Sequence, residues 1–388
     1  MSHGLTRTAR TGSLALLLVA LPVFAFQQPK TFIPVEGANL KAKIENAIVA
    51  GRVHSVNGRF WVAYQFEVRP SVSIDFDVLE SVNGVYTVID NATITSDARY
   101  ETRELGYFMM YDTQREAFIR ADIYNLRRDH EYGNYPVYWA GRISNEESLN
   151  YLKSLVDTPN PDPSGLGNRA LYAISLHDDA RVDTILMEYA HRPAGDAVRF
   201  RALELLGTTP ETQAKNTLLA DIVRNPQENS ETRQTALASL SLSRSAAMLP
   251  VFQNLFETMP TRELKRIALR GIGRSDNSDA AATYLSRVLE NEKDVELRKS
   301  AVANLGRVPG QKSFTALTST IDGDTDVEIQ KQAVLALGRR AKDEAVPVLI
   351  RVARNHPQMP VRKVAIQVLG QTGDQRAVAF FSELLSKD

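Results

Sequence analysis

The sequence predicts a mainly α fold: a right-handed α-solenoid of about seven helical pairs, preceded by a small antiparallel β-rich domain that ends in a helix (α+β). Three observations lead to this prediction. A helical signature recurs seven times after residue 165, residues 46–143 alternate with period two, and a Pro- and Gly-rich stretch at 157–167 separates the two regions. A chain of 388 residues has room for this organisation.

Residues 1–25 have the features of a signal peptide. Arg7 and Arg10 precede an apolar run, residues 14–26, of only 13 residues, whereas a membrane-spanning helix needs roughly 20. Val23 and Ala25 fit cleavage after Ala25. We therefore expect an exported protein, periplasmic or secreted, that begins near Phe26 and has no membrane span after cleavage; a retained N-terminal anchor is the alternative. The chain has no cysteine, so an oxidising compartment holds no risk of mispaired disulfides.

The β-rich domain is expected over residues 36–156, after a flexible lead-in at 26–35. Apolar side chains alternate in 60–68 and 71–79, and Asn57-Gly58 and Asn83-Gly84 are typical two-residue turns. Further strands are predicted at the end of this series, in residues 106–112, 116–126 and 136–143. Residues 40–50 fit either a helix or a strand.

A helix should close this domain. Ser144 and Glu147 have the spacing of a capping box in front of residues 146–156. Residues 157–167 are then expected to form a linker, and residues 168–388 the helical array.

The array is defined by an alanine that recurs every 32 to 34 residues. The seven anchoring alanines are Ala170, Ala202, Ala236, Ala268, Ala301, Ala333 and Ala365. Apolar residues recur at offsets −4, +1 and +4 from each alanine, which places them on one stripe of a helix. Glycine at offset +5 in five of the repeats predicts the end of the helix. One helical pair cannot bury its stripe alone, so stacking of neighbours must create the core.

Two segments, "DVELRKSAVANLG" (294–306) and "DVEIQKQAVLALG" (326–338), resemble the HEAT-like repeat in the short form first described in phycobilisome lyases. The resemblance covers about 165–388 and implies that the signature helix lines a concave face. It also implies that a basic residue at offset −3 pairs with an aspartate at the turn. The basic residue is present as Arg199, Arg233, Lys265, Arg298 and Arg362, but a matching aspartate is clear only at Asp294 and Asp326. Such arrays include scaffolds, adaptors, lyases and nucleic-acid enzymes, so the resemblance implies the fold and not the function. The N-terminal domain resembles no family that we recognise.

No sequence motif indicates catalysis. GxSxG, Walker and HExxH patterns are absent, and the histidines are dispersed, so we expect no enzyme activity, no cofactor and no metal. His177 is expected in a solvated turn at a helix end. The aromatic-rich stretch 127–141 fits either a ligand platform or a small core, and the core is the favoured interpretation.

Three classes of function remain. The first is an exported scaffold or adaptor, without catalysis, that binds a protein or peptide through the solenoid surface. The second is an enzyme or enzyme accessory with a pocket at the domain junction. The third is a nucleic-acid-binding protein, which the export signal disfavours. The net charge also disfavours it: of 46 basic and 46 acidic residues, cleavage removes Arg7 and Arg10, so the exported protein has a net charge of −2.

A candidate partner-binding surface comes from offsets −2, +2 and +6, which lie opposite the anchoring alanine. Residues 261–388 contain 21 basic and 16 acidic residues, against 23 and 30 in residues 26–260. These offsets carry the predicted basic stripe of Arg266, Arg270, Arg274, Lys299, Arg307, Lys331, Arg339 and Lys363. The alternative is a solvated face neutralised by nearby carboxylates. The stripe would suit an acidic polypeptide, an anionic polymer or the acidic first domain of the chain itself; the sequence does not predict the oligomeric state.

Overall fold

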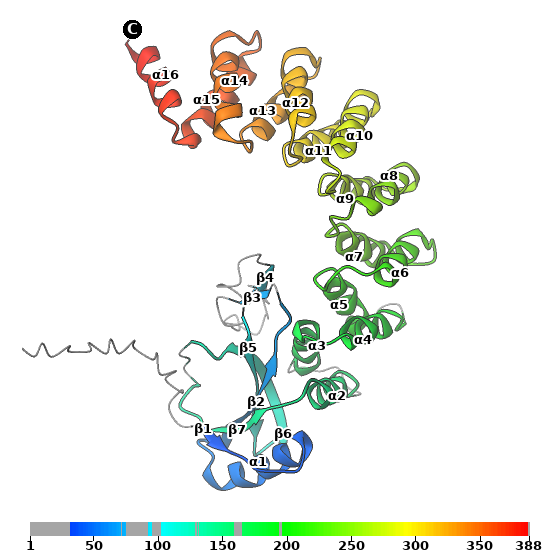
Figure 1. Cartoon of the computed structure of the whole chain (residues 1–388), viewed down its shortest axis with the longest axis vertical. Coiled ribbons are helices and arrows are strands. Elements are labelled where there is room, and N and C mark those ends of the chain that lie inside the picture. Colours follow the sequence, from blue (N-terminus) through cyan, green and yellow to red (C-terminus); the bar gives the residue numbers. More distant parts are fainter. Residues whose placement is uncertain are drawn as a thin grey trace, which may run out of the picture.

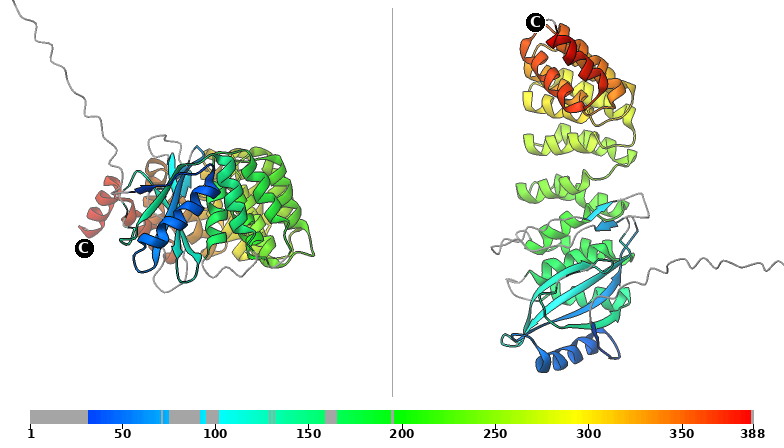
Figure 2. Two further views of the ribbon diagram at one scale, coloured as in Figure 1. Left: turned by 90° about the horizontal axis from the view of Figure 1, so that it is seen from below. Right: turned by 90° about the vertical axis from the view of Figure 1, so that its left-hand side faces the viewer.

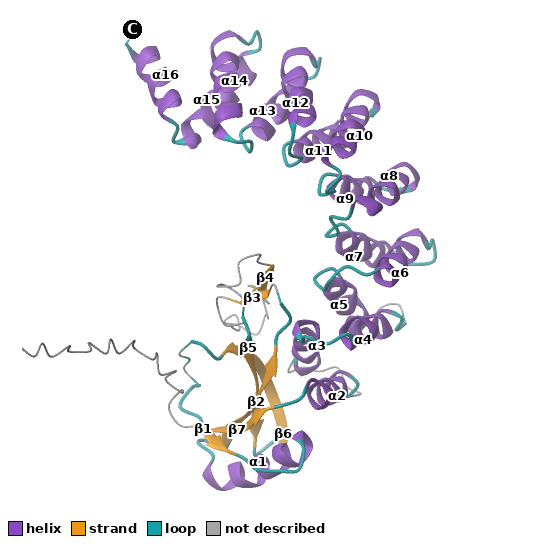
Figure 3. Cartoon of the chain, in the orientation of Figure 1, coloured by secondary structure: helices purple, strands orange, loops and turns teal. Residues whose placement is uncertain are grey.

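The computed structural model describes residues 32–70, 72–74, 92–94, 102–128, 130, 132–158, 165–193 and 196–386. A β-domain lies at one end of a curved array of helices (Figure 1). All strands belong to this end, and the rest of the described chain is helical (Figure 3). No helix in the described ranges is long and apolar enough to cross a membrane.

The β-domain is built on a five-stranded mixed sheet in the order β1-β7-β2-β5-β6. Its strands are β1 (Phe32–Pro34), β2 (Arg59–Glu67), β5 (Glu104–Asp112), β6 (Ala117–Asn125) and β7 (Val137–Arg142). The strands β2, β5 and β6 are antiparallel, as the alternation predicts, but β7 runs parallel to β2 and to β1. A separate antiparallel pair consists of β3 (Val72–Ile74) and β4 (Ala92–Ile94). The predicted turn at Asn83-Gly84 lies outside the described residues.

Both faces of the sheet are covered, which explains why β2 is apolar on both sides. Phe60, Tyr64 and Phe66 point into the main core, whereas Trp61 and Ala63 belong to a second, smaller core. The ambiguous segment 40–50 is helical: it belongs to α1 (Leu40–His54), which Asn39 caps and which packs on β2 and β7. Asn57 and Gly58 both have positive φ, as predicted, but their turn joins α1 to β2 rather than two strands.

Residues 32–34 correct the predicted flexible lead-in. They form β1, because Phe32 stacks on Trp139 with ring centroids 4.8 Å apart and contacts Phe108 and Tyr132 edge-on. The aromatic stretch 127–141 contributes to the same cluster. Tyr132 stacks on Phe108, and its carbonyl accepts a hydrogen bond from Trp61 Nε1 at 3.1 Å. The described part of this stretch therefore packs into a hydrophobic core, which confirms the favoured interpretation.

The array contains fifteen helices within the described residues. They are α2 (Asn145–Val156), α3 (Leu166–Leu176), α4 (Arg181–Ala190), α5 (Ala197–Leu206), α6 (Gln213–Arg224), α7 (Ser230–Leu240), α8 (Leu249–Thr258), α9 (Arg262–Ile272), α10 (Ser278–Asn291), α11 (Val295–Leu305), α12 (Gln311–Gly323), α13 (Val327–Leu337), α14 (Lys342–Asn355), α15 (Met359–Thr372) and α16 (Gln375–Leu385). Pairs of helices stack in layers along the array (Figure 2). The odd-numbered helices from α3 to α15 carry the signature and lie on the inner side of the curve (Figure 1).

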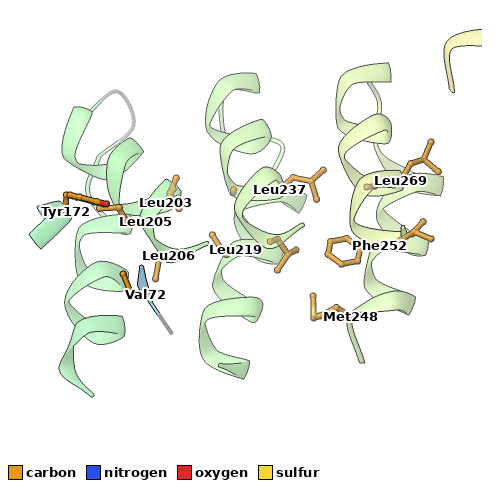
Figure 4. Close-up of a cluster of buried hydrophobic side chains, with 14 of the residues drawn as sticks. Val72, Tyr172, Leu203, Leu205, Leu206, Leu219, Leu237, Met248, Phe252 and Leu269 are labelled. Carbon is orange, nitrogen blue, oxygen red and sulfur yellow. The ribbon is translucent and has the colours of Figure 1, made fainter. Parts of the chain in front are cut away.

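Stacking creates the core as predicted. All seven anchoring alanines are fully buried. The residue after the alanine is also buried in the first six repeats, and Figure 4 shows it as Leu203, Leu237 and Leu269 in three successive layers. The same position in the last repeat, Ile366, is 39% exposed. The structure is thus an α-solenoid of repeated helical pairs, in which each layer covers the stripe of the one before.

The glycines at offset +5 end four of the signature helices as predicted, since Gly207, Gly273, Gly306 and Gly338 are the C-cap residues, whereas α15 continues past Gly370 to Thr372. Gly207, Gly273, Gly306 and Gly338 have negative φ values between −62° and −68°, so they do not form left-handed helix stops. They allow close approach instead: a Cβ on Gly306 would lie 2.8 Å from the Ala336 carbonyl oxygen of the next signature helix. The glycine therefore sets the spacing between layers.

The basic residue at offset −3 caps the helix before it. Arg199 Nε, Arg233 Nε and Arg298 Nε donate to carbonyl oxygens in the last turns of α4, α6 and α10, at 2.9, 2.8 and 3.0 Å. Asp294 and Asp326 cap the N-termini of their own signature helices and are not the partners of the basic residues at offset −3. Arg298 pairs with Asp324, and Arg199 with Glu228. This arrangement fixes α5, α7 and α11 to the helices that precede them.

The β-domain and the array share one core. The helix α2, capped by Ser144 as predicted, packs on α3 in the way that α4 packs on α5, so it is the first helix of the array. At the seam, the Arg69 amide donates to Leu176 O at 2.9 Å, and the Asp178 amide donates to Glu67 O at 3.2 Å. The end of β2 is thereby joined to the end of α3.

His177 lies at this seam and is buried, which corrects its expected place in a solvated turn. Only 1% of the residue is exposed, and its ring stacks on Phe66 with centroids 4.3 Å apart. Nδ1 donates to the Ala173 carbonyl at 2.7 Å, and Nε2 lies 2.8 Å from Ser148 Oγ. Ser148 Oγ is in turn 3.1 Å from the Tyr64 hydroxyl. One hydrogen-bonded chain therefore crosses from β2 through α2 to α3.

Candidate binding surface

The inner face of α9, α11, α13 and α15 carries three rows of side chains. The rows come from offsets −2, +2 and +6: the first two lie four residues apart on one line along each helix, and the third follows in the turn after α9, α11 and α13. On α13 this line is Lys331, Leu335 and Arg339. The row at −2 is basic on all four helices, and the row at +6 is basic after α9, α11 and α13.

The row at offset −2 is only partly neutralised. Lys299 Nζ is 2.9 Å from Glu296 Oε1, and Lys331 Nζ is 2.7 Å from Glu328 Oε1. The hydrogen bond to Glu296 raises the pKa of Lys299. Arg266 and Lys363 are exposed, and no described carboxylate lies within ion-pair distance of either. The neutralised-face alternative thus holds for two of the four cations.

The row at offset +2 is mixed. It consists of Arg270, Ala303, Leu335 and Gln367, and Leu335 is 40% exposed. An exposed leucine in the middle of an otherwise polar inner face offers apolar area to a partner. The two basic rows therefore flank a floor that is apolar on α11 and α13.

The row at offset +6 starts with Arg274, Arg307 and Arg339, which are all exposed. Each follows the C-terminus of its helix, where the helix dipole favours a cation. Arg274 Nη1 donates to Ser241 O at 3.4 Å, and Arg307 Nη1 donates to Asn304 Oδ1 at 3.3 Å. The predicted single stripe is thus resolved into two basic rows, joined at Arg270.

A pocket of about 880 Å³ lies along the inner edge, between the β-domain and the fifth repeat. Arg69 and Val72 line it from the β-domain, and the helices α3 and α6 and the turns after α5, α7, α9 and α11 line most of the rest. Arg69 Nη2 donates to Thr208 O at 2.6 Å, and Lys215 Nζ donates to Thr209 O and Pro210 O, both at 2.8 Å. Both cations are therefore hydrogen-bonded to backbone carbonyl groups within the protein. The sequence did not predict them, because their partners come from turns that only the fold brings together.

Comparison with known proteins agrees with the repeat architecture. Residues 315–388 match a family model described as HEAT repeats. No curated protein matches the chain. The match covers the last part of the array, and the seven signature helices extend the same repeat pattern from α3 to α15.

Several solved structures are similar to it. The complex of CpcE and CpcF of phycocyanin lyase from Nostoc sp. is 13% identical over 67% of this chain and 98% of that chain, with a TM-score of 0.33. Human deoxyhypusine hydroxylase in complex with glycerol is 15% identical over 61% of this chain and 90% of that chain, with a TM-score of 0.29. The YibA protein of E. coli is 15% identical over 63% and 88%, with a TM-score of 0.33.

Proposed function

We propose that this protein is an exported scaffold without catalytic activity, and that it binds an acidic, partly apolar segment of a protein partner along α9, α11, α13 and α15. The observation that carries the proposal is the line Lys331, Leu335 and Arg339 on α13, with its basic, apolar and basic character. The lines on α9 and α11 repeat the two basic ends, whereas the line on α15 is basic only at Lys363. Such a face complements carboxylates on both edges of an extended chain and an apolar side chain at its centre.

The size of the surface defines the ligand. Packed helices lie about 8–10 Å apart, so four inner helices span about 24–30 Å. An extended chain advances about 3.3 Å per residue, and eight or nine residues would therefore cross the surface. A suitable probe is a fluorescein-labelled decapeptide in which glutamate and leucine alternate.

The enzyme alternative placed a pocket at the domain junction, and the pocket beside Arg69 and Val72 lies there. Its lining offers little for catalysis. It contains no histidine, and Lys215, whose pKa burial lowers, already donates to Thr209 and Pro210. The scaffold is therefore the function that we propose.

The test is peptide binding by the mature protein, residues 26–388, measured by fluorescence anisotropy at 50 and 300 mM salt. We expect binding at low salt that weakens at high salt, since exposed charges are screened. The variant R266Q/K299Q/K331Q/K363Q should bind the peptide with an affinity that is lower by about tenfold or more. A matched control neutralises four other cations, on α10, α12 and α14: R287Q/K312Q/R351Q/R354Q.

Both variants lower the net charge by four, so only the location differs. Equal affinities for the two variants would refute the inner-face assignment. Loss of binding only in the first variant, with unchanged circular dichroism, supports it.

Export has its own test. Mass spectrometry of the protein purified from its native cells should give an N-terminus at or near Phe26. An intact residue 1 would contradict cleavage.

A further inference from the structure

Three arginines meet at the part of the pocket formed by the third, fourth and fifth repeats. Arg244 follows α7, Arg274 follows α9 and Arg307 follows α11, and all three line the pocket. They come from three turns that are 30 and 33 residues apart in the chain. Only Arg244 has a carboxylate partner among the described residues, Asp276 at 3.3 Å, and both of these side chains are largely exposed.

Layer spacing is what brings these turns together. Gly273 lets α9 approach α11 so closely that a Cβ there would lie 2.8 Å from Asn304 Cβ. Asn304 Oδ1 accepts from Arg307, so Arg274, which follows Gly273, lies beside Arg307. On the other side, the Asp276 amide donates to Arg244 O at 2.7 Å and ties the third turn to the fourth.

The local electrostatics are unfavourable without a ligand. Partial burial lowers the pKa of Arg274, and the positive charges of Arg270, Arg307 and Arg244 lower it further. The helix dipole explains one arginine after each helix, but it does not explain why three share one pocket where they repel each other. A bound anion would remove this repulsion and satisfy guanidinium donors that the described protein leaves open.

We propose that this part of the pocket binds a compact oxyanion with two or more negative charges, either a phosphoryl or a polycarboxylate group, between Arg274, Arg307 and Arg244. Arg307 and Arg274 donate hydrogen bonds to its oxygens. Arg244 also donates to the anion, in place of its exposed ion pair with Asp276. The pocket volume of about 880 Å³ accommodates a ligand larger than the anionic group alone. The site shares Arg274 and Arg307 with the row at offset +6 of the proposed peptide surface, whereas the row at offset −2 does not line the pocket.

The experiment is isothermal titration calorimetry of the mature protein with inorganic pyrophosphate and with citrate, at 50 mM salt. We expect one site for at least one of these two probes, and no heat beyond dilution with acetate, which carries a single charge. Tighter binding of pyrophosphate would identify a phosphoryl ligand, and tighter binding of citrate a polycarboxylate. R307Q should weaken binding about tenfold or more, because a hydrogen bond to a charged group is lost.

The chain provides a matched control. Arg339 occupies the same helical position as Arg307, one repeat later, but it does not line the pocket. R339Q should therefore bind as the unchanged protein does. Failure of both pyrophosphate and citrate to bind would overturn the proposal, and so would equal weakening by R307Q and R339Q. The peptide test above changes only residues of the row at offset −2, so failure of that proposal and failure of this one are distinguishable.

Discussion

Acidification should weaken the seam between the β-domain and the array through His177. The Nδ1 proton is donated to the Ala173 carbonyl, so Nε2 must accept in the neutral ring, and Ser148 is the group that donates to it. Burial lowers the pKa of His177 to about 4, from an ordinary value of 6.5. Because the folded pKa is the lower one, the fold favours the neutral ring.

The size of the effect follows from linkage. The unfolded chain takes up a proton near pH 6.5, and the folded chain does so only near pH 4. The stabilisation is therefore complete above pH 6.5 and is lost as the pH falls towards 4. At pH 4.5 the loss of unfolding free energy should be about 2 to 3 kcal/mol. Asp179 does not contribute in this range, because its hydrogen bond and ion pair with Arg181 lower its pKa to about 2.

Urea unfolding at pH 7.5 and pH 4.5, followed by Trp fluorescence, measures this loss, since both tryptophans lie in the β-domain. H177Q removes the titrating group, so the unchanged protein should lose about 2 to 3 kcal/mol more than H177Q between the two pH values. H54Q is the matched control, as His54 is exposed on α1, and it should behave as the unchanged protein. An H177Q variant with the full pH dependence would refute the reasoning.

Three further predictions follow from the packing of the repeats. G306A should lower the free energy of unfolding by about 1–3 kcal/mol, because its Cβ would meet the Ala336 carbonyl, whereas G370A, where nothing lies within 4 Å, should be neutral or slightly stabilising in thermal melts. Deletion of residues 294–325 removes one repeat in register and should leave a folded, shorter array, whereas L305D buries an unpaired charge and should lose more helical circular dichroism than the deletion does. The linker sequence favours proteolysis within 157–167, and the two fragments should then elute together in size-exclusion chromatography. The reason is that α2 packs on α3 and that the Arg69 and Asp178 amides form hydrogen bonds across the seam. Separation of the fragments would contradict the shared core.

The repeats were predictable from sequence because their core is made by one local pattern. Seven alanines at nearly constant spacing, each with the same apolar neighbours, define which helix face is buried without any knowledge of tertiary contacts. The inner position of the signature helices followed from the resemblance to HEAT-like repeats. The role of the glycines did not follow, because close approach between layers, unlike a left-handed helix end, depends on the partner helix.

The seam between the β-domain and the array could not be predicted for a related reason. His177 stands in the polar string "HDDAR", and only its contacts with Phe66 and Ser148, more than 25 residues away, make it a core residue. The parallel strand β7 and the short β1 likewise depend on pairing between distant segments. For the candidate surface, sequence periodicity selected the exposed face of the helices, but it merged two rows that the structure separates.

Lysine acetylation footprinting tests the central claim, that the inner face binds the partner, most directly. The mature protein is labelled with and without the glutamate–leucine decapeptide, and modification of each lysine is measured by mass spectrometry. Lys363 and Lys331 lie in the row at offset −2, whereas Lys312 lies on α12 and is exposed. The account predicts that the peptide protects Lys363 and Lys331 and leaves Lys312 unchanged. Protection of Lys312, with Lys363 and Lys331 modified as in the free protein, would contradict it.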